Sequence, residues 1–161
     1  IFTGKISYFK GIKELIRSYE RLKKEYDNFY LLLIGFLQDE KLVSEIKTTD
    51  GIILLDSVPN NSLYKYYSAA DFAIWPNHVT ISHFEAMACR LPIIVSNLEV
   101  AKERVVWENG FFLNSLSVDE IYEKSKLMII NQPMRKQMGE RALKAINNEL
   151  SWDVIVNKFL P

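Results

Sequence analysis

Two lysines bracket a short loop near the start of the chain. The segment Gly4-Lys5-Ile6-Ser7-Tyr8-Phe9-Lys10-Gly11 follows an apolar run and precedes an amphipathic stretch. Free backbone N–H groups at a helix start, together with two ammonium groups, suit the binding of a phosphate. The segment matches neither a Walker loop nor a GxGxxG loop, so two solvated surface lysines remain the alternative explanation. Lys5 and Lys10 are therefore candidate phosphate ligands.

A second polar segment lies between an apolar run that ends at Pro76 and a helix expected to pass through Cys89. Its sequence is Asn77-His78-Val79-Thr80-Ile81-Ser82-His83-Phe84-Glu85. Ser82 and Glu85 have the spacing of a capping box, in which two side chains satisfy free N–H groups and no ligand is needed. An acidic residue at such a place also accepts the hydroxyls of a ribose. Spacing alone leaves both explanations of Glu85 open.

The helical period assigns faces to the residues of this helix. It predicts that Ile81, Phe84 and Ala88 face the core. Ser82 and Glu85 are then left near the helix start, where either explanation could apply.

Short apolar runs alternate with segments of helical period along the first two thirds of the chain. Ile1-Phe2-Thr3 opens as a strand, and further runs cover residues 30–35, 52–55, 72–75 and 92–95. Runs this short and this uniformly apolar are typical of parallel strands covered on both faces. The segments between them predict helices over 11–26, 40–48 and 63–69. The pattern predicts an α/β fold, a Rossmann-like doubly wound parallel sheet flanked by helices, with both polar segments at the carboxyl ends of strands.

The last third of the chain is mostly helical. Ser117 to Glu120 form a capping-box sequence that opens a helix expected to run to Ile130, and Pro133 stands where the next helix begins. A final amphipathic stretch follows Ser151. We expect its apolar side chains to be covered partly by another domain; they are Trp152, Ile155, Val156 and Phe159.

Size and charge limit the classes of protein to consider. The 161 residues (18.8 kDa) fit one domain, residues 1–161. Twenty basic residues balance twenty acidic ones, which argues against a nucleic-acid partner. No signal peptide or membrane-spanning run is present, so we expect a cytoplasmic protein. Because the chain opens with Ile1 rather than Met, we expect a fragment of a longer, two-domain protein.

Metal binding is not expected. Cys89 is the single cysteine, which excludes an internal disulfide and a cysteine cluster. His78 and His83 are five residues apart and so do not share a helical face as zinc-binding pairs do. We expect no metal and no cofactor.

Six short segments, spread in order over nearly the whole chain, form a series. They are Thr3-Gly4-Lys5 with Lys10-Gly11, Leu32-Leu33-Ile34-Gly35, Ala69-Ala70-Asp71-Phe72-Ala73-Ile74-Trp75-Pro76, Phe84-Glu85-Ala86-Met87-Ala88-Cys89-Arg90-Leu91-Pro92, Asn109-Gly110-Phe111 and Ser151-Trp152. Together they resemble the C-terminal, donor-nucleotide-binding domain of GT-B glycosyltransferases of family 4, also called glycosyltransferases group 1. One such segment is weak evidence, whereas six in register are specific.

The resemblance implies a nucleotide-sugar site. Lys5 and Lys10, beside Gly4, would hold the diphosphate, and Glu85 would bind the ribose hydroxyls. These two lysines and Glu85 are the expected catalytic residues. The backbone around Thr80, Ile81 and Ser82 would meet phosphates and sugar, and the loop at Val58, before Leu63, would cover the base. Asn77 stands where the family has a glutamate that contacts the donor sugar.

The resemblance also implies an activity and partners. Such enzymes transfer a hexose from a nucleotide-diphosphate sugar to a glycan or lipid-linked acceptor, with retention, in making polysaccharide, capsule or lipopolysaccharide. The missing N-terminal domain of the same chain would bind the acceptor and could place the protein at the inner face of the cell membrane. The fragment alone is expected to be inactive. The alternative is a catalytically inactive GT-B-like nucleotide-binding or interaction domain.

Departures from the family pattern indicate either a divergent donor preference or an inactive relative. Asn77 carries no charge, and Lys5 lacks the bidentate fork of the family's arginine. His78-Val79-Thr80 replaces a glycine-rich turn, and Arg90 replaces a helix-ending glycine, an unfavourable residue in a left-handed conformation.

Overall fold

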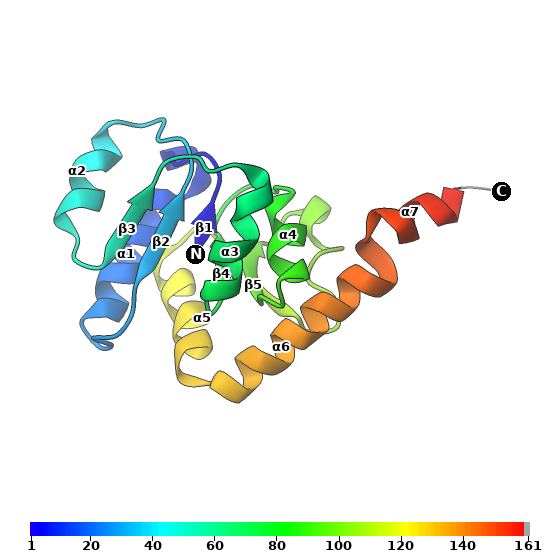
Figure 1. Ribbon diagram of the computed structural model, residues 1–161. Coiled ribbons are helices and arrows are strands. Elements are labelled where there is room, and N and C mark those ends of the chain that lie inside the picture. The colour runs from blue at the N-terminus through cyan, green and yellow to red at the C-terminus, as the bar shows by residue number, and fades with distance from the viewer. Residues whose placement is uncertain (160–161) are drawn as a thin grey trace.

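Six parallel strands form the centre of the computed structural model, which describes residues 1–159 (Figure 1). They are β1 (Phe2–Thr3), β2 (Leu31–Ile34), β3 (Ile52–Leu55), β4 (Ala73–Trp75), β5 (Ile93–Ser96) and β6 (Gly110–Leu113). The strands pair in the orders β1-β2-β3 and β4-β5-β6. The two halves meet where the Ile74 N–H donates to the Ile1 carbonyl at 2.9 Å. The resulting order, β3-β2-β1-β4-β5-β6, is that of a doubly wound sheet and confirms the predicted fold class.

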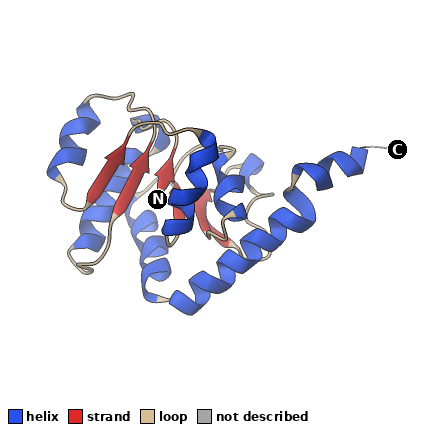
Figure 2. Cartoon of the chain, viewed as in Figure 1, coloured by secondary structure: helices blue, strands red, loops and turns tan. Residues whose placement is uncertain are grey.

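Helices cover both faces of this sheet (Figure 2). On one face α1 (Ile12–Lys23) packs against α2 (Lys41–Thr48) and α5 (Val118–Ile130). On the other face α4 (Ser82–Ala88) packs against α3 (Leu63–Ala69) and α6 (Gln132–Ala145). A π-helical turn (Ile146–Leu150) leads to α7 (Trp152–Phe159), which extends away from the sheet in Figure 1. This arrangement leaves the carboxyl ends of the strands for the connecting loops.

The apolar stripe predicted for α1 is confirmed. Its residues are all buried, namely Ile12, Leu15, Ile16, Tyr19 and Leu22. Burying one such face against a sheet stabilises a helix more than its intrinsic propensity does. The helix begins after Gly11 and ends at Lys23, three residues short of the predicted end.

The predicted start of α5 is confirmed, with a different use of its glutamate. The Ser117 hydroxyl accepts a hydrogen bond from the Glu120 N–H at 3.1 Å. The Glu120 carboxylate binds the N–H groups of Asn114 and Ser115 instead of returning to Ser117. Pro133 lies in the first turn of α6, as predicted.

Two expectations about strands are wrong. β3, at the edge of the sheet, is not covered on both faces, since Ile53 is 46 % exposed. No strand is predicted from the sequence at β6. This strand contains the short apolar run Phe111-Phe112-Leu113, but it begins with a glycine and follows an irregular segment in which Trp107 and Glu108 have left-handed backbones, with φ of 53° and 57°.

The predicted face of α4 is also wrong. Ile81 and Ala88 are exposed, and Phe84 is only half-buried. The residues that face the core are His83, Ala86 and Met87.

The apolar face predicted for the last segment is described only in part. Val156 is 46 % exposed, and Ile155 is half-buried. The side chains of Trp152 and Phe159 lie outside the described part of the chain, so the expected covering by another domain stays a prediction.

Candidate functional site

The loop between β1 and α1 is anchored at both ends. The Tyr8 N–H donates to the Asp39 carboxylate at 2.8 Å, and Ile6 forms a parallel bridge with Leu37. At the other end Gly11 has a φ of 75°, a left-handed conformation that glycine adopts without strain. A Cβ at Gly11 would lie 2.9 Å from the Cβ of Pro76, so the start of α1 approaches the β4–α4 loop closely. The loop that carries Lys5 and Lys10 is therefore held against its neighbour.

Asn77 connects the two loops directly. Its amide nitrogen Nδ2 donates to the Phe9 carbonyl at 2.8 Å, and its Oδ1 accepts from the His78 N–H at 3.0 Å. From a third segment, Arg104 donates to the Thr80 carbonyl at 2.6 Å. These bonds position the β4–α4 loop beside the lysines.

A cavity of about 410 Å³ lies between the two loops at the carboxyl ends of β1 and β4. Five of the predicted site residues line it: Gly4, Lys5, Lys10, Asn77 and Thr80. The remaining lining residues are Phe2, Thr3, Ser7, Phe9, Gln38, Trp75 and His78. Carboxyl ends of strands at the centre of a doubly wound sheet are where such folds bind ligands.

The charges in the cavity favour an anion. Burial, and next the charge of Lys5, lower the pKa of Lys10. Within the described residues no salt bridge is formed by either lysine. Two ammonium groups that repel each other in a partly desolvated cavity bind an anion favourably, since the anion reduces their repulsion and accepts charge-assisted hydrogen bonds.

Glu85 lies outside this cavity, in the first turn of α4. Its Oε2 is buried and has no hydrogen-bond partner among the described residues. Its charge adds to the effect of burial in raising the pKa of the neighbouring Tyr67 to about 12. A buried carboxylate oxygen without a donor is costly.

The capping-box explanation of Ser82 and Glu85 is wrong. The N-cap of α4 is Ile81, whose side chain makes no cap hydrogen bond, and Ser82 is already the first helical residue. The Ser82 N–H lies 3.4 Å from the Thr80 hydroxyl, which takes the place of a cap. Glu85 is therefore not needed to begin the helix.

The remaining predicted residues do not line the cavity. Val58, in the loop after β3, and Leu63, at the start of α3, are half-buried and pack against the core. Ile81 is 58 % exposed, and Ser82 is half-buried. Their expected contacts with base, phosphates and sugar stay predictions.

Two departures from the family pattern fall at backbone positions that suit glycine. His78 has a φ of 74° and Arg90 a φ of 60°, both left-handed. A residue with a Cβ pays roughly 1–2 kcal/mol in that conformation. The sequence-based expectation of strain at Arg90 is therefore confirmed, and His78 takes a glycine-like conformation with a side chain attached.

Hydrogen bonds and ring packing connect the ends of β1 and β4 beside the cavity. The Trp75 indole donates to the Thr3 carbonyl at 2.9 Å, and the Thr3 hydroxyl lies 2.7 Å from the Tyr67 hydroxyl. His83 packs against Trp75, with ring centroids 4.6 Å apart. These residues fix the ends of β1 and β4 on which the two loops stand.

Sequence reasoning missed several residues of the site. Arg104 holds the Thr80 carbonyl from an irregular segment, where no periodicity marks it. Gln38 and Ser7 line the cavity as isolated polar residues without a motif. The sequence marks His78 only by its place beside Asn77 and two residues before Thr80, which line the same cavity.

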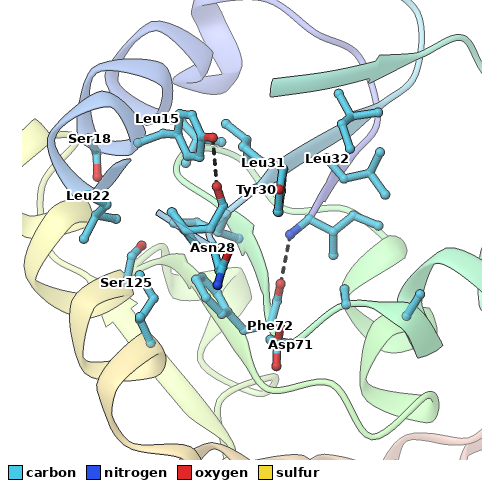
Figure 3. A pocket seen from close by; sticks show the side chains of 18 of the residues that line it. Leu15, Ser18, Leu22, Asn28, Tyr30, Leu31, Leu32, Asp71, Phe72 and Ser125 are labelled. Atoms are coloured by element: carbon cyan, nitrogen blue, oxygen red, sulfur yellow. Dashed lines mark hydrogen bonds between the residues drawn. The ribbon is translucent and has the colours of Figure 1, made fainter. Parts of the chain in front are cut away.

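A second cavity, of about 440 Å³, lies at the amino ends of the strands (Figure 3). Its wall is mainly apolar and includes Leu15 and Leu22 of α1 together with Phe72. None of the predicted site residues lines it. Its position, opposite to the loops that feed the helix starts, separates it from the candidate site.

No cluster of three or more metal-ligating side chains occurs among the residues that the structure describes. The absence of a metal from the reaction stays a prediction.

The fold and the cavity define a class of protein. The fold is that of the C-terminal domain of GT-B glycosyltransferases. The C-terminal domain of a glycosyl transferase group 1 family protein (LpcC) from Francisella tularensis superposes with a TM-score of 0.81 at 21% identity, over 92% of this chain and 84% of that one. A mutant of S. aureus TarM, crystallised with fondaparinux, α-GlcNAc-glycerol and UDP, superposes with a TM-score of 0.83 at 17% identity, over 98% of this chain and 34% of that one.

The family follows from the sequence match. The family model for glycosyl transferases group 1 matches residues 1–145, and the chain belongs to this family. The capsular polysaccharide biosynthesis glycosyltransferase CapM of Staphylococcus aureus is 29% identical over 168 aligned positions, which cover 96% of this chain and 42% of that protein. A lipopolysaccharide 1,2-N-acetylglucosaminetransferase of Salmonella typhimurium is 23% identical, over 99% of this chain and 46% of that protein. The chain thus spans less than half the length of these relatives.

Proposed function

We propose that this chain is the donor-binding domain of a glycosyltransferase that moves a hexose from a nucleotide-diphosphate sugar to a glycan or lipid-linked acceptor. The observation that carries the proposal is the cavity at the strand ends, with Lys5 and Lys10 in its wall. The presence of UDP in the related TarM complex supports a nucleotide as the ligand.

In the proposed reaction the two lysines would bind the diphosphate and stabilise the negative charge that develops when it leaves the sugar. Preorganised positive groups at the place where charge develops are a large part of catalysis in group transfer. Free N–H groups at the start of α1, just after Lys10, would add partial positive charge. Glu85 would accept the ribose hydroxyls.

Titration with UDP, GDP and ADP tests the binding proposal. Amide chemical shifts should move in both loops, residues 4–11 and 77–85, for at least one of these nucleotides. If none of the three moves either loop at millimolar concentration, the proposal is wrong.

Lys10→Ala should weaken diphosphate binding by about 1.5–3 kcal/mol, since it removes one charge-assisted contact. Affinity for the corresponding nucleoside should stay within a factor of about two. Lys24→Ala is the matched control, because Lys24 is exposed just beyond the far end of α1 and its replacement changes the net charge equally. Calorimetric titration measures all three proteins. An equal loss in both variants would mean that only net charge matters.

Glu85→Gln should weaken nucleoside binding as well as diphosphate binding, because an amide replaces the charged acceptor for the ribose hydroxyls. We expect a loss of about 1.5–3 kcal/mol for the nucleoside. The free energy of unfolding should not fall, since the buried Oε2 makes no hydrogen bond to the described residues. A variant that is less stable and binds normally would assign Glu85 to structure alone.

The acceptor side of the reaction belongs to the rest of the protein. We propose that the missing N-terminal domain binds the glycan or lipid-linked acceptor, that transfer occurs with retention, and that this domain brings the enzyme to the inner face of the membrane. No helix in the part that the structure describes could cross a membrane.

We expect no sugar transfer by this chain alone. Orienting an acceptor hydroxyl against the anomeric carbon is a large share of catalysis, and one domain provides half of the cleft. A radiolabelled donor, incubated with this chain and with a version extended upstream, measures the difference. Transfer by the unextended chain would contradict the expectation.

A second candidate function is a GT-B-like domain that binds a nucleotide and does not transfer sugar. Asn77 favours it, because its amide joins two loops where a glutamate would contact the donor sugar. An extended protein that binds donor but neither transfers nor hydrolyses it across a broad panel would establish this alternative.

A further inference from the structure

The Asn77 side chain holds the two loops of the cavity together. Its nitrogen donates to the Phe9 carbonyl, and its oxygen accepts from the His78 N–H. A glutamate could not make the first of these bonds, since a carboxylate has no hydrogen to donate to a carbonyl. The side chain at position 77 therefore clamps two loops together.

His78, the next residue, is held in the wall of the same cavity. Its backbone has a φ of 74° although it is not glycine. Its ring meets the edge of Phe9, with centroids 5.7 Å apart, and its Nδ1 lies 2.7 Å from the Val79 carbonyl. A strained backbone that is held by several contacts at a cavity is a reason to look for a function of the side chain.

The contact with Val79 determines the tautomer of the neutral ring. A carbonyl oxygen only accepts, so Nδ1 carries the hydrogen and Nε2 is left as a hydrogen-bond acceptor. The lysines in the cavity are donors only and suit phosphate oxygens. An acceptor in the same wall suits a different part of the ligand, namely a hydroxyl group.

We infer that His78 supplies a side-chain contact to the sugar of the nucleotide-sugar, with Nε2 accepting a hydrogen bond from a sugar hydroxyl. This inference rests on the proposed function. It makes His78 a determinant of donor recognition at a position where the family pattern offers no side chain.

The test compares wild type with His78→Gly, using UDP, GDP and ADP and then UDP-glucose, UDP-N-acetylglucosamine, GDP-mannose and ADP-glucose. Wild type should bind one nucleotide-sugar more tightly than its nucleotide diphosphate. In His78→Gly this advantage should fall about three- to tenfold, the effect of one hydrogen bond, while nucleotide diphosphate affinity stays within about twofold. Glycine also relieves the left-handed backbone, so the variant folds.

Nitrogen chemical shifts of the imidazole, recorded at about pH 8, give a second readout. The chain has two histidines, so assignment is direct. Nε2 of His78 should shift with the nucleotide-sugar and not with the nucleotide diphosphate. Three results would overturn the inference. Wild type could bind no nucleotide-sugar more tightly than its nucleotide diphosphate, His78→Gly could keep the same ratio of the two affinities as wild type, or the Nε2 chemical shift could stay unchanged when the nucleotide-sugar is added. Failure of wild type to bind any nucleotide diphosphate overturns the proposed function instead.

Discussion

Gly35→Ala is expected to lower the free energy of unfolding by about 3–5 kcal/mol. Gly35 follows β2 with a φ of 146°, and a Cβ there would lie 1.8 Å from the Gly4 carbonyl oxygen. That oxygen belongs to backbone, so the clash is relieved only by moving the end of β1 and the loop that carries Lys5. Urea denaturation measures the loss, and nucleotide titration shows whether the loop has moved.

Gly4→Ala is the matched control for this substitution. Gly4 also has a left-handed φ, of 126°, but its nearest atom to an added Cβ is on the Phe2 ring at 4.0 Å. Gly4→Ala introduces backbone strain without a steric clash, so its free energy of unfolding should fall by roughly 1–3 kcal/mol. An equal loss in the two variants would show that the close approach at Gly35 carries no steric cost.

The protein is expected to lose about 3 kcal/mol of stability between pH 7 and pH 4 through His83 alone. Burial, and then the charges of Arg104 and Lys10, lower the pKa of His83 to about 3. An imidazole in the unfolded chain takes up its proton near pH 6.5, whereas the folded protein does not. Stability is therefore complete above that pH and falls as the pH drops toward 3.

Urea denaturation of wild type and His83→Leu over this pH range isolates the effect. Leucine fills a similar space beside Trp75 and does not titrate. Carboxylates contribute equally to both proteins, so they cancel in the difference between the two curves. The curve of the variant should be flatter by about 3 kcal/mol, and parallel curves would contradict the prediction.

His78 and His83 show how burial assigns different roles to one residue type. His83 is fully buried against Trp75 and is expected to stay neutral in the folded state over most of the acidic range. His78 is exposed, lies in the cavity wall and offers a nitrogen to a ligand. Sequence spacing distinguished neither role.

The sequence by itself determined the elements with strong local signals. The stripe of α1 follows from apolar period, the bounds of α3 from the turn residues Pro59-Asn60-Asn61 before it, and the Ser117 cap of α5 from capping chemistry, all of which act within a few residues. Uniformly apolar runs identified all strands except β1, a strand of two residues recognised from the opening of the chain, and β6, whose short run Phe111-Phe112-Leu113 follows a glycine and an irregular segment. The fold class follows from their alternation with helices, because parallel strands require crossovers.

The tertiary structure alone decided how the polar segments combine. It placed Lys5, Lys10 and Thr80 around one cavity and left Glu85 outside it, since this depends on how far each loop travels after its strand. It also joined Asn77 to the Phe9 carbonyl, 68 positions away in the chain, so that this side chain connects two loops. Hydrogen bonds over such separations leave no period in the sequence, so only the packed chain shows which side chains remain for a ligand.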